Sequence, residues 1–581
     1  MQRREFLQAM SAAALAGIIP KNLLAQANFE YQYQLPSNGD LRILHFTDVH
    51  GQLLPVHFRE PSVNLGIGSA KNKPPHLVGT HALRYYGLSP DSPEAHALTY
   101  LGFDEASRRY GKMGGFAHIA SLVKRLRQDF GVDRTLLLDG GDTWQGSATA
   151  LWTQGEDMVA ACNELGVDAM TGHWEFTYPE QRIRENIKLF KGDFLAQNIF
   201  VKEEAQFEGA ETFAEDSGLA LRPYTIKSMA GIRIAIIGQA FPYTPVANPS
   251  RYIPNWSFGI REYELQATID KVRDKEKAKL VILLSHNGMD VDLKLAKRVS
   301  GLDVILGGHT HDAVPQAVSI TNAGGRTLVT NAGSSGKFVG VFDIKLSKNG
   351  ISGYRYRLLP VFSNLIEADK SMSALIKKVR APYEKKLTTP LAVAGELFYR
   401  RGNFNGSFDQ LICDALLEEY DAEIALSPGF RWGTSVLAGD TITLEDVMAQ
   451  TAITYPETYM REMSGKDIKA ILEDVCDNLF NKDAYQQQGG DMVRTGGLEY
   501  ACDPNASIGH RIKDLRLSSG RKLQANKNYK VTGWATVNSK ATGRAVWDIV
   551  ADYLKASKTA RIAHLEQPRL LGINKNMGIE L

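Results

Sequence analysis

Leu41-Arg42-Ile43-Leu44-His45-Phe46-Thr47-Asp48-Val49-His50 is a short, largely apolar run that ends in an aspartate and a histidine. Short apolar runs closed by polar residues are typical of buried β-strands. In open α/β folds, ligands bind beyond the carboxyl ends of the strands. We therefore expect Asp48 and His50 to face a binding site at the end of a strand.

Four later apolar runs end in the same way. Polar clusters follow residues 135–138, 167–170, 280–284 and 304–306, and they read Gly140-Gly141-Asp142, Gly172-His173, Ser285-His286-Asn287 and Gly308-His309-Thr310-His311. Five of the 13 histidines occupy this kind of position. One such cluster alone would be an ordinary polar loop, whereas five predict one shared metal site. Carboxylate and imidazole groups without a thiolate suit divalent metals that accept O and N ligands.

The five clusters resemble the motifs of the metallophosphoesterase superfamily, D-x-H, G-D, G-N-H-[DE], a lone His and G-H-x-[HQ], and they occur in the same order. The resemblance implies a four-layer α-β-β-α core. It also implies two sets of metal ligands, with Asp48, His50 and His311 on one metal, His173, His286 and His309 on the other, and Asp142 bridging both. Two metals about 3.5–4 Å apart can share a hydroxide nucleophile.

One motif departs from the superfamily form G-N-H-E-F-D. Here the chain has Gly172-His173-Trp174-Glu175-Phe176-Thr177, which places Trp174 on the catalytic His and Thr177 on its Asp partner. Without that pair an alkoxide leaving group lacks help, whereas a less basic sulfur leaving group can depart unprotonated. We assign Trp174 to the rim of the catalytic site. The alternative, that Trp174 only fills a pocket at the rim, stays open.

Three longer strings, at 58–66, 399–406 and 426–433, narrow the resemblance to the SoxB thiosulfohydrolases of bacterial sulfur oxidation. That family implies a second α/β domain of the 5′-nucleotidase type and a centre of two Mn²⁺ ions per chain, with Zn²⁺ as the other option. It implies hydrolysis of a cysteine S-thiosulfonate on the SoxYZ carrier protein, with release of sulfate. A periplasmic 5′-nucleotidase or cyclic-nucleotide phosphodiesterase is the alternative.

The resemblance also suggests substrate contacts in the second domain. Arg431 falls where 5′-nucleotidases carry a Gly-rich turn with an arginine, and a guanidinium can grip a sulfonate with two hydrogen bonds. We expect Arg431 to bind the substrate and to stabilise developing charge. Arg400, Arg401 and Asn403 form a second polar cluster, and we expect Arg400 and Asn403 to contact the substrate as well. For Arg431, an ordinary arginine in a surface turn is the alternative.

The pattern along the 581 residues predicts the domain bounds. Arg3-Arg4, the apolar stretch 9–19 and Ala25-Gln26-Ala27 resemble a twin-arginine export signal over 1–27, which predicts a periplasmic protein. We expect the metal domain at 28–367, a linker helix at 368–390 broken at Pro382, and the second domain at 391–581. The long stretch between His50 and Lys112 suggests a cover over the substrate.

Charge and composition limit which kinds of partner are expected, and the positions of the cysteines indicate which of them are free thiols. A net charge of +2 without Lys/Arg runs gives no reason to expect nucleic acid or anionic membranes as partners. No apolar stretch is long enough to span a membrane. Cys162 and Cys413 lie on amphipathic helical patterns and are expected to be buried free thiols. The sequence does not show how the four cysteines pair, if they do.

Overall fold

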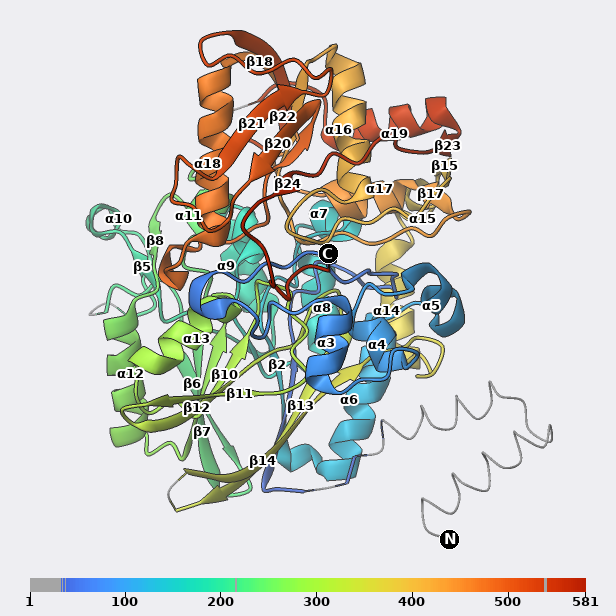
Figure 1. The fold of residues 1–581 in the computed structure, drawn as a ribbon. Helices are drawn as coiled ribbons and strands as arrows, with labels where there is room; N and C mark the ends of the chain where they lie inside the picture. Colours follow the sequence, from blue (N-terminus) through green and yellow to red (C-terminus); the bar gives the residue numbers. More distant parts are fainter. Residues whose placement is uncertain are drawn as a thin grey trace, which may run out of the picture.

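The protein is described here from a computed structural model that covers residues 33, 35–36, 38–214, 217–348, 350–537 and 541–580. The predicted export signal, 1–27, lies outside the described residues. Two sheet-containing parts stand one above the other, with the carboxyl-terminal part at the top of Figure 1.

The amino-terminal part contains two six-stranded sheets. The first has the order β14 (Gly350–Pro360), β13 (Phe338–Ser347), β1 (Leu41–Phe46), β2 (Thr135–Asp139), β3 (Ala169–Met170) and β4 (Asp193–Phe194). The second has the order β11 (Val318–Asn322), β12 (Gly325–Asn331), β10 (Val304–Gly307), β9 (Leu280–Ser285), β7 (Ile232–Gln239) and β6 (Tyr224–Met229). The central strands of each sheet run parallel. Antiparallel strands close both edges of the second sheet and the β13–β14 edge of the first, whereas β4 at the other edge of the first sheet runs parallel to β3.

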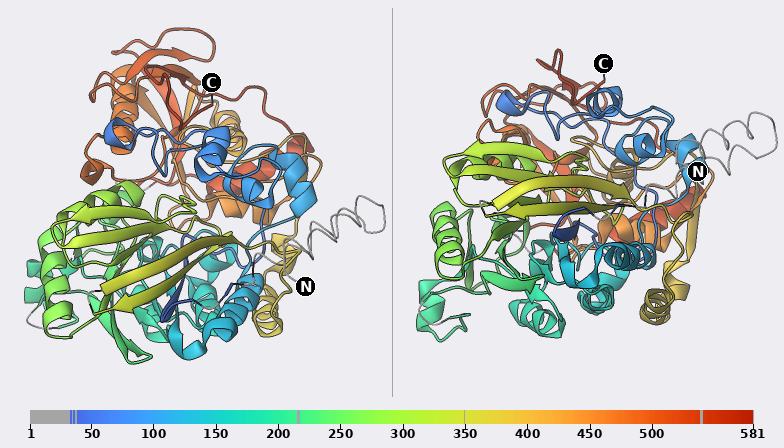
Figure 2. Two further views of the ribbon diagram at one scale, coloured as in Figure 1. Left: turned by 60° about the horizontal axis from the view of Figure 1, so that its bottom comes forward. Right: turned by 90° about the horizontal axis from the view of Figure 1, so that it is seen from below.

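The two sheets pack face to face, and helices cover their outer faces (Figure 2). Ile43 and Leu138 from one sheet share a buried apolar core with Ile282 and Leu306 from the other. Helices α6 (Phe116–Phe130) and α8 (Glu156–Leu165) pack on the first sheet, whereas α12 (Glu262–Asp274) and α13 (Met289–Arg298) pack on the second. This confirms the predicted four-layer α-β-β-α core. Strands covered on both faces need continuous apolar runs, which explains the sequence pattern.

The carboxyl-terminal part is a second α/β unit with three small sheets. Their orders are β17 (Thr441–Thr443), β15 (Pro390–Ala394) and β23 (Thr559–Ala560); β18 (Thr458–Ser464), β22 (Asn528–Trp534), β16 (Ile424–Ser427) and β19 (Arg494–Gly496); and β21 (Ile512–Leu517), β20 (Leu498–Cys502) and β24 (Arg569–Leu570). The helices of this unit are α16 (Ser407–Tyr420), α17 (Leu444–Thr451), α18 (Gly465–Phe480) and α19 (Val546–Ser557).

Between the two parts the chain forms α14 (Lys370–Arg380) and α15 (Glu384–Leu387), separated at Pro382. Proline has no N–H to continue a helix, which accounts for a break at this place. Shorter elements complete the first part, and these are α7 (Ala148–Thr153), α9 (Glu180–Leu189), α10 (Glu203–Phe207), α11 (Thr244–Ala247), β5 (Ile199–Val201) and β8 (Trp256–Phe258). Among the residues that the structure describes, none of the helices has both the length and the apolar composition needed to cross a membrane.

The stretch between His50 and Lys112 is more ordered than a loop. It contains α3 (Gly79–Tyr86), α4 (Pro93–Leu98) and α5 (Phe103–Tyr110). It also holds the end of the chain, because Asn64 N–H donates to Gly578 O and Val78 N–H donates to Met577 O. The blue segments of Figure 1 accordingly lie beside the red carboxyl-terminal tail.

Candidate metal centre

The seven residues predicted to bind metal meet where strand ends of both sheets converge. Asp48 and His50 follow β1, Asp142 follows β2, His173 follows β3, His286 follows β9, and His309 and His311 follow β10. Two groups of possible ligand atoms form, each with its atoms within 4.8 Å of one another, and they consist of Asp48, His50, Asp142 and His311, and of Asp142, His173, His286 and His309. All seven side chains are buried, and Asp142 belongs to both groups. Two buried clusters that share a carboxylate can hold a dinuclear metal site.

Strained backbone aims these side chains at one centre. Five of the seven have a left-handed φ, namely Asp48 (53°), His50 (51°), Asp142 (58°), His309 (73°) and His311 (58°). Such conformations cost on the order of 1–3 kcal/mol each and persist only where the surroundings enforce them. Here backbone hydrogen bonds join the loops, because Asp48 N–H donates to Gly141 O and His50 N–H donates to Asp142 O, both at 2.8 Å.

Glu175 braces the same loops, and the sequence analysis assigned it no role. Its carboxylate accepts hydrogen bonds from the backbone N–H groups of Asp142, Thr143, Trp144 and His173 at 2.7–3.2 Å. These bonds tie the loop after β2 to the loop after β3. The buried glutamate thus fixes where Asp142 and His173 lie relative to each other.

The electrostatics of the clusters suit cations. Burial alone would lower the pKa of His286, but Asp142 and Asp48 raise it to about 10. Its Nε2 lies 2.9 Å from Asp142 Oδ2. Burial and the neighbouring His173 hold the pKa of His309 well below its usual range. Two carboxylates therefore attract positive charge, while most of the imidazoles stay neutral and able to bind a metal.

The nitrogens that face the clusters give a direct test of the fit. His50 Nε2 lies 3.0 Å from His311 Nε2, which lies 3.3 Å from Asp48 Oδ1. His173 Nδ1 and His286 Nε2 lie 3.3 and 2.9 Å from Asp142 Oδ2. Imidazole nitrogens and carboxylate oxygens that converge in this way are ligands that divalent cations accept, so the donor set fits two divalent cations.

Trp174 and Thr177 occupy the positions of the missing acid–base pair. The Trp174 ring meets Trp432 and Phe430 edge-on, at 4.9 and 5.4 Å between centroids, and lines a cavity of about 270 Å³ beside the clusters. The Thr177 hydroxyl lies 2.7 Å from the Thr454 hydroxyl. Neither residue can act there as a carboxylate–imidazole pair. Trp174 fills the rim of the cavity. This position is compatible with a role at the rim of the catalytic site and also with the alternative that the ring only fills a pocket.

Arg431 reaches the metal-site cavity from the second domain, where it lines the same space as His50, His309 and His311. Its Nη2 donates to Gly490 O at 2.8 Å, and its Nε lies 3.5 Å from Asp491 Oδ1. Burial lowers its pKa from the usual range, although Asp491 opposes this. Arg431 is therefore not an ordinary arginine in a surface turn, and its contact with a substrate stays a prediction.

Arg400 and Asn403 have a different environment from the one expected. Arg400 is buried and donates to Asp409 Oδ1 at 2.7 Å and to Gln450 O at 2.5 Å. Asn403 accepts from Leu65 N–H at 2.7 Å. Neither is among the residues that line the metal-site cavity. The structure therefore corrects the expectation of substrate contact, because both side chains are engaged by protein groups.

Asp491 holds the arginines at the site, and the sequence analysis missed it. Its buried carboxylate lies 3.3–3.5 Å from nitrogens of Arg401, Arg431 and Arg494. Burial raises its pKa, but the three guanidinium groups outweigh burial and keep the pKa below its usual range. The signal was present, because Gly489-Gly490-Asp491 repeats the form of Gly140-Gly141-Asp142.

Comparison with known proteins finds similarity to phosphoesterases. The family described as "5′-nucleotidase, C-terminal domain" matches residues 393–551. The trifunctional nucleotide phosphoesterase protein YfkN of Bacillus subtilis is 25% identical over 490 residues, which are 77% of this chain. The chain spans only 32% of that longer protein. The 5′-nucleotidase of Bos taurus is 26% identical over 462 residues, with 72% of this chain and 76% of the relative covered.

Solved structures narrow the relationship. A 5′-nucleotidase precursor from Thermus thermophilus superposes with a TM-score of 0.71 at 21% identity, covering 92% of this chain and 99% of the other, and shows the shared fold. The sulfate thiohydrolase SoxB of Thermus thermophilus, solved in complex with glycerol, has a TM-score of 0.87 and 35% identity. The match covers 94% of this chain and 99% of that one. The chain therefore belongs to the SoxB family, within the 5′-nucleotidase superfamily of two-domain hydrolases.

Proposed function

We propose that this protein is a thiosulfohydrolase that acts on a cysteine S-thiosulfonate carried by a protein of the SoxYZ kind and releases sulfate. One observation carries the proposal. The metal clusters are complete, yet Trp174 and Thr177 replace the acid–base pair that an alkoxide leaving group needs. The likeness to SoxB over nearly the whole chain supports the same substrate.

Several residues that line the metal-site cavity have distinct roles in the proposed hydrolysis. Arg431 binds the sulfonate oxygens and balances charge as water attacks the terminal sulfur. Trp174, Phe430 and Trp432 keep bulk water from the departing sulfur. The bond between the sulfonate sulfur and the sulfur next to it breaks, and its electron pair stays on that neighbouring sulfur. The products are a carrier persulfide, sulfate and two protons. Two bound divalent cations would supply an activated water and oppose the charge on the oxygens.

We propose two Mn²⁺ ions per chain, with Zn²⁺ as the other candidate. The cluster offers only imidazole nitrogens and carboxylate oxygens, and this donor set accepts either metal. Manganese competes poorly with zinc for such a site. Export of an already folded protein by the twin-arginine route would allow metal loading before export. A periplasmic location is therefore part of the proposal.

A nucleotidase or cyclic-nucleotide phosphodiesterase remains the second candidate because the curated relatives include such enzymes. The experiment that separates them compares two substrates on the purified, metal-loaded protein. We expect sulfate release from thiosulfonate-loaded carrier and little phosphate release from AMP. Comparable kcat/KM values for the two substrates would contradict the proposal, and activity on AMP alone would establish the second candidate.

A further inference from the structure

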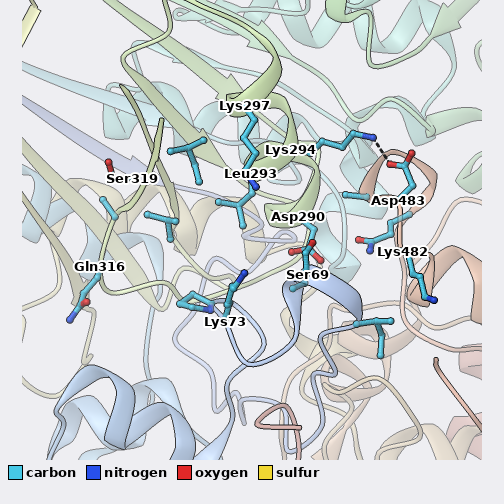
Figure 3. Close-up of a pocket in the computed structure, with 18 of the residues that line it drawn as sticks. Ser69, Lys73, Asp290, Leu293, Lys294, Lys297, Gln316, Ser319, Lys482 and Asp483 are labelled. Atoms are coloured by element: carbon cyan, nitrogen blue, oxygen red, sulfur yellow. Dashed lines mark hydrogen bonds and ion pairs between the residues drawn. The ribbon is translucent and has the colours of Figure 1, made fainter. Parts of the chain in front are cut away.

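A second and larger cavity, of about 810 Å³, adjoins the metal-site cavity. One segment of chain separates them, because Gln487 lines the second cavity and Gln488 lines the metal-site cavity. The walls of the larger cavity come from the segment between 67 and 86, from α13 and β11 of the first domain, and from residues 482–487 of the second (Figure 3). Parts of the chain distant in sequence thus build one concave surface.

The second cavity carries excess positive charge. Four lysines line it, Lys73, Lys294, Lys297 and Lys482, together with two acids, Asp290 and Asp483. Both acids are already paired, Asp290 with His76 at 3.0 Å and Asp483 with Lys294 at 2.5 Å. In the described part of the chain, the other three lysines have no acidic partner within ion-pair distance. Figure 3 shows the amines of Lys73 and Lys297 pointing toward each other across the cavity.

An open sheet edge forms one wall of the same cavity. Strand β11 stands at the end of its sheet and pairs only with β12 among the described strands, and Gln316–Ile320 line the cavity. The free edge of such a strand offers backbone N–H and C=O groups that an extended peptide can pair with. In an extended peptide, alternate side chains point to the same face. Acidic residues at alternate positions would therefore face the lysines together.

We propose that this cavity docks an extended acidic segment of the carrier protein. The inference rests on the proposed function, because a substrate attached to a protein needs a docking surface outside a reactive cavity of about 270 Å³. The lysines select for negative charge, and the β11 edge selects for extended backbone. Charge complementarity of this kind affects mainly the rate and specificity of association.

The test is the variant Lys73→Glu/Lys297→Glu. For thiosulfonate-loaded carrier we expect KM to rise roughly tenfold or more and to lose most of its salt dependence, while kcat is unchanged. For free cysteine S-thiosulfonate, which needs no docking, kcat/KM should stay as in the wild type. Lys275→Glu/Lys279→Glu changes two exposed lysines in the segment after α12, so it makes the same charge change elsewhere. This control should leave the kinetics with both substrates unchanged.

A binding measurement separates the docking inference from the proposed function. The probe is a fluorescently labelled nine-residue peptide of alternating glutamate and valine. Its binding to the protein is measured by fluorescence anisotropy. Wild-type protein should bind it, and Lys73→Glu/Lys297→Glu should not. Equal binding by the two proteins, or an unchanged KM for the carrier, would overturn the docking surface. If the wild type hydrolyses neither the loaded carrier nor free cysteine S-thiosulfonate, the proposed function is wrong. The peptide measurement still tests the docking surface in that case.

A different observation carries a second inference, about Cys476 in α18 and Cys502 in β20. Both are fully buried, and their Sγ atoms lie 3.6 Å apart. Small side-chain rotations bring such atoms to the S–S bond length of about 2.05 Å. Helix α18 also carries Val475 and Asn478, which line the metal-site cavity. A bond at this place would fix one wall of that cavity to β20.

We infer that Cys476 and Cys502 become a disulfide when the protein folds with a disulfide oxidant such as oxidised glutathione. The Cys476 thiolate attacks one glutathione sulfur and releases one glutathione. The Cys502 thiolate then attacks the Cys476 sulfur and releases the second. Two electrons and two protons pass from the protein thiols to two glutathione molecules.

Mass spectrometry tests the disulfide. Protein folded with oxidised glutathione, then denatured and alkylated, should show two reactive thiols, at Cys162 and Cys413, and a linked peptide pair that contains 476 and 502. The Cys476→Ala variant should show three alkylated thiols and no linked pair. Four alkylated thiols in the wild type would refute the inference.

Discussion

Replacing Arg431 by lysine tests how the second domain takes part in the reaction. The guanidinium has three contacts in the structure, to Gly490 O at 2.8 Å, to His309 O at 3.5 Å and to Asp491 at 3.5 Å. Lysine keeps the charge but has one nitrogen, so it cannot hold these groups and also grip a sulfonate with two bonds. The loss is one charge-assisted hydrogen bond or more, about 1.5–3 kcal/mol.

That energy corresponds to a fall of about tenfold to a hundredfold in kcat/KM. The assay is steady-state sulfate release from loaded carrier by Arg431→Lys and Arg431→Ala, with metal content and thermal midpoint measured in parallel. Both variants should retain two metal equivalents, because no ligand is changed. Near wild-type kinetics in both variants would refute the assignment of Arg431 to the substrate.

Three further results are expected. Asp142→Ala should abolish dinuclear metal binding and turnover together, since this carboxylate belongs to both clusters, and two retained metal equivalents would show that the bridge is misassigned. The wild type should hydrolyse phosphate monoesters poorly, because Trp174 supplies no acid, and efficient phosphate release from AMP would contradict the leaving-group argument. Burial alone would lower the pKa of His76, but Asp290 raises it above the ordinary 6.5. The ion pair should therefore stabilise the fold fully below that value and lose its effect as pH rises through the raised pKa. In His76→Gln, the free energy of unfolding should lack this pH dependence, and parallel curves for the two proteins would disprove the effect.

Local pattern was sufficient for the buried strands and for the polar clusters at their ends, whereas the four-layer core and the division of the ligands between two metals followed from the family resemblance. Each ligand sits one to four residues beyond the last residue of a strand, so the identity of a strand and of the residues that follow it determines the cluster. The same apolar runs predicted strands covered on both faces. The Gly172–Thr177 string also showed that the acid–base pair was missing.

The contacts of the second domain could not be predicted in this way. Arg400, Arg401 and Arg431 all looked suitable for an anion, yet Arg400 turns to Asp409 whereas Arg431 reaches the metal-site cavity. The Gly489-Gly490-Asp491 string marks Asp491, but no spacing rule pairs it with Arg431, which lies 60 residues away along the chain. The stretch after His50 looked like a long loop but forms three helices and holds the carboxyl-terminal tail.

The difference has a physical cause. A strand and the residues at its end follow from neighbouring side chains, through burial and backbone preference. The partner of a buried charge depends on which distant group shares its desolvated space, because an unpaired charge there is costly. That choice is made only when distant segments of the second domain pack together. The sequence therefore determined the ligands, while the tertiary structure decided which arginine reaches the metal-site cavity.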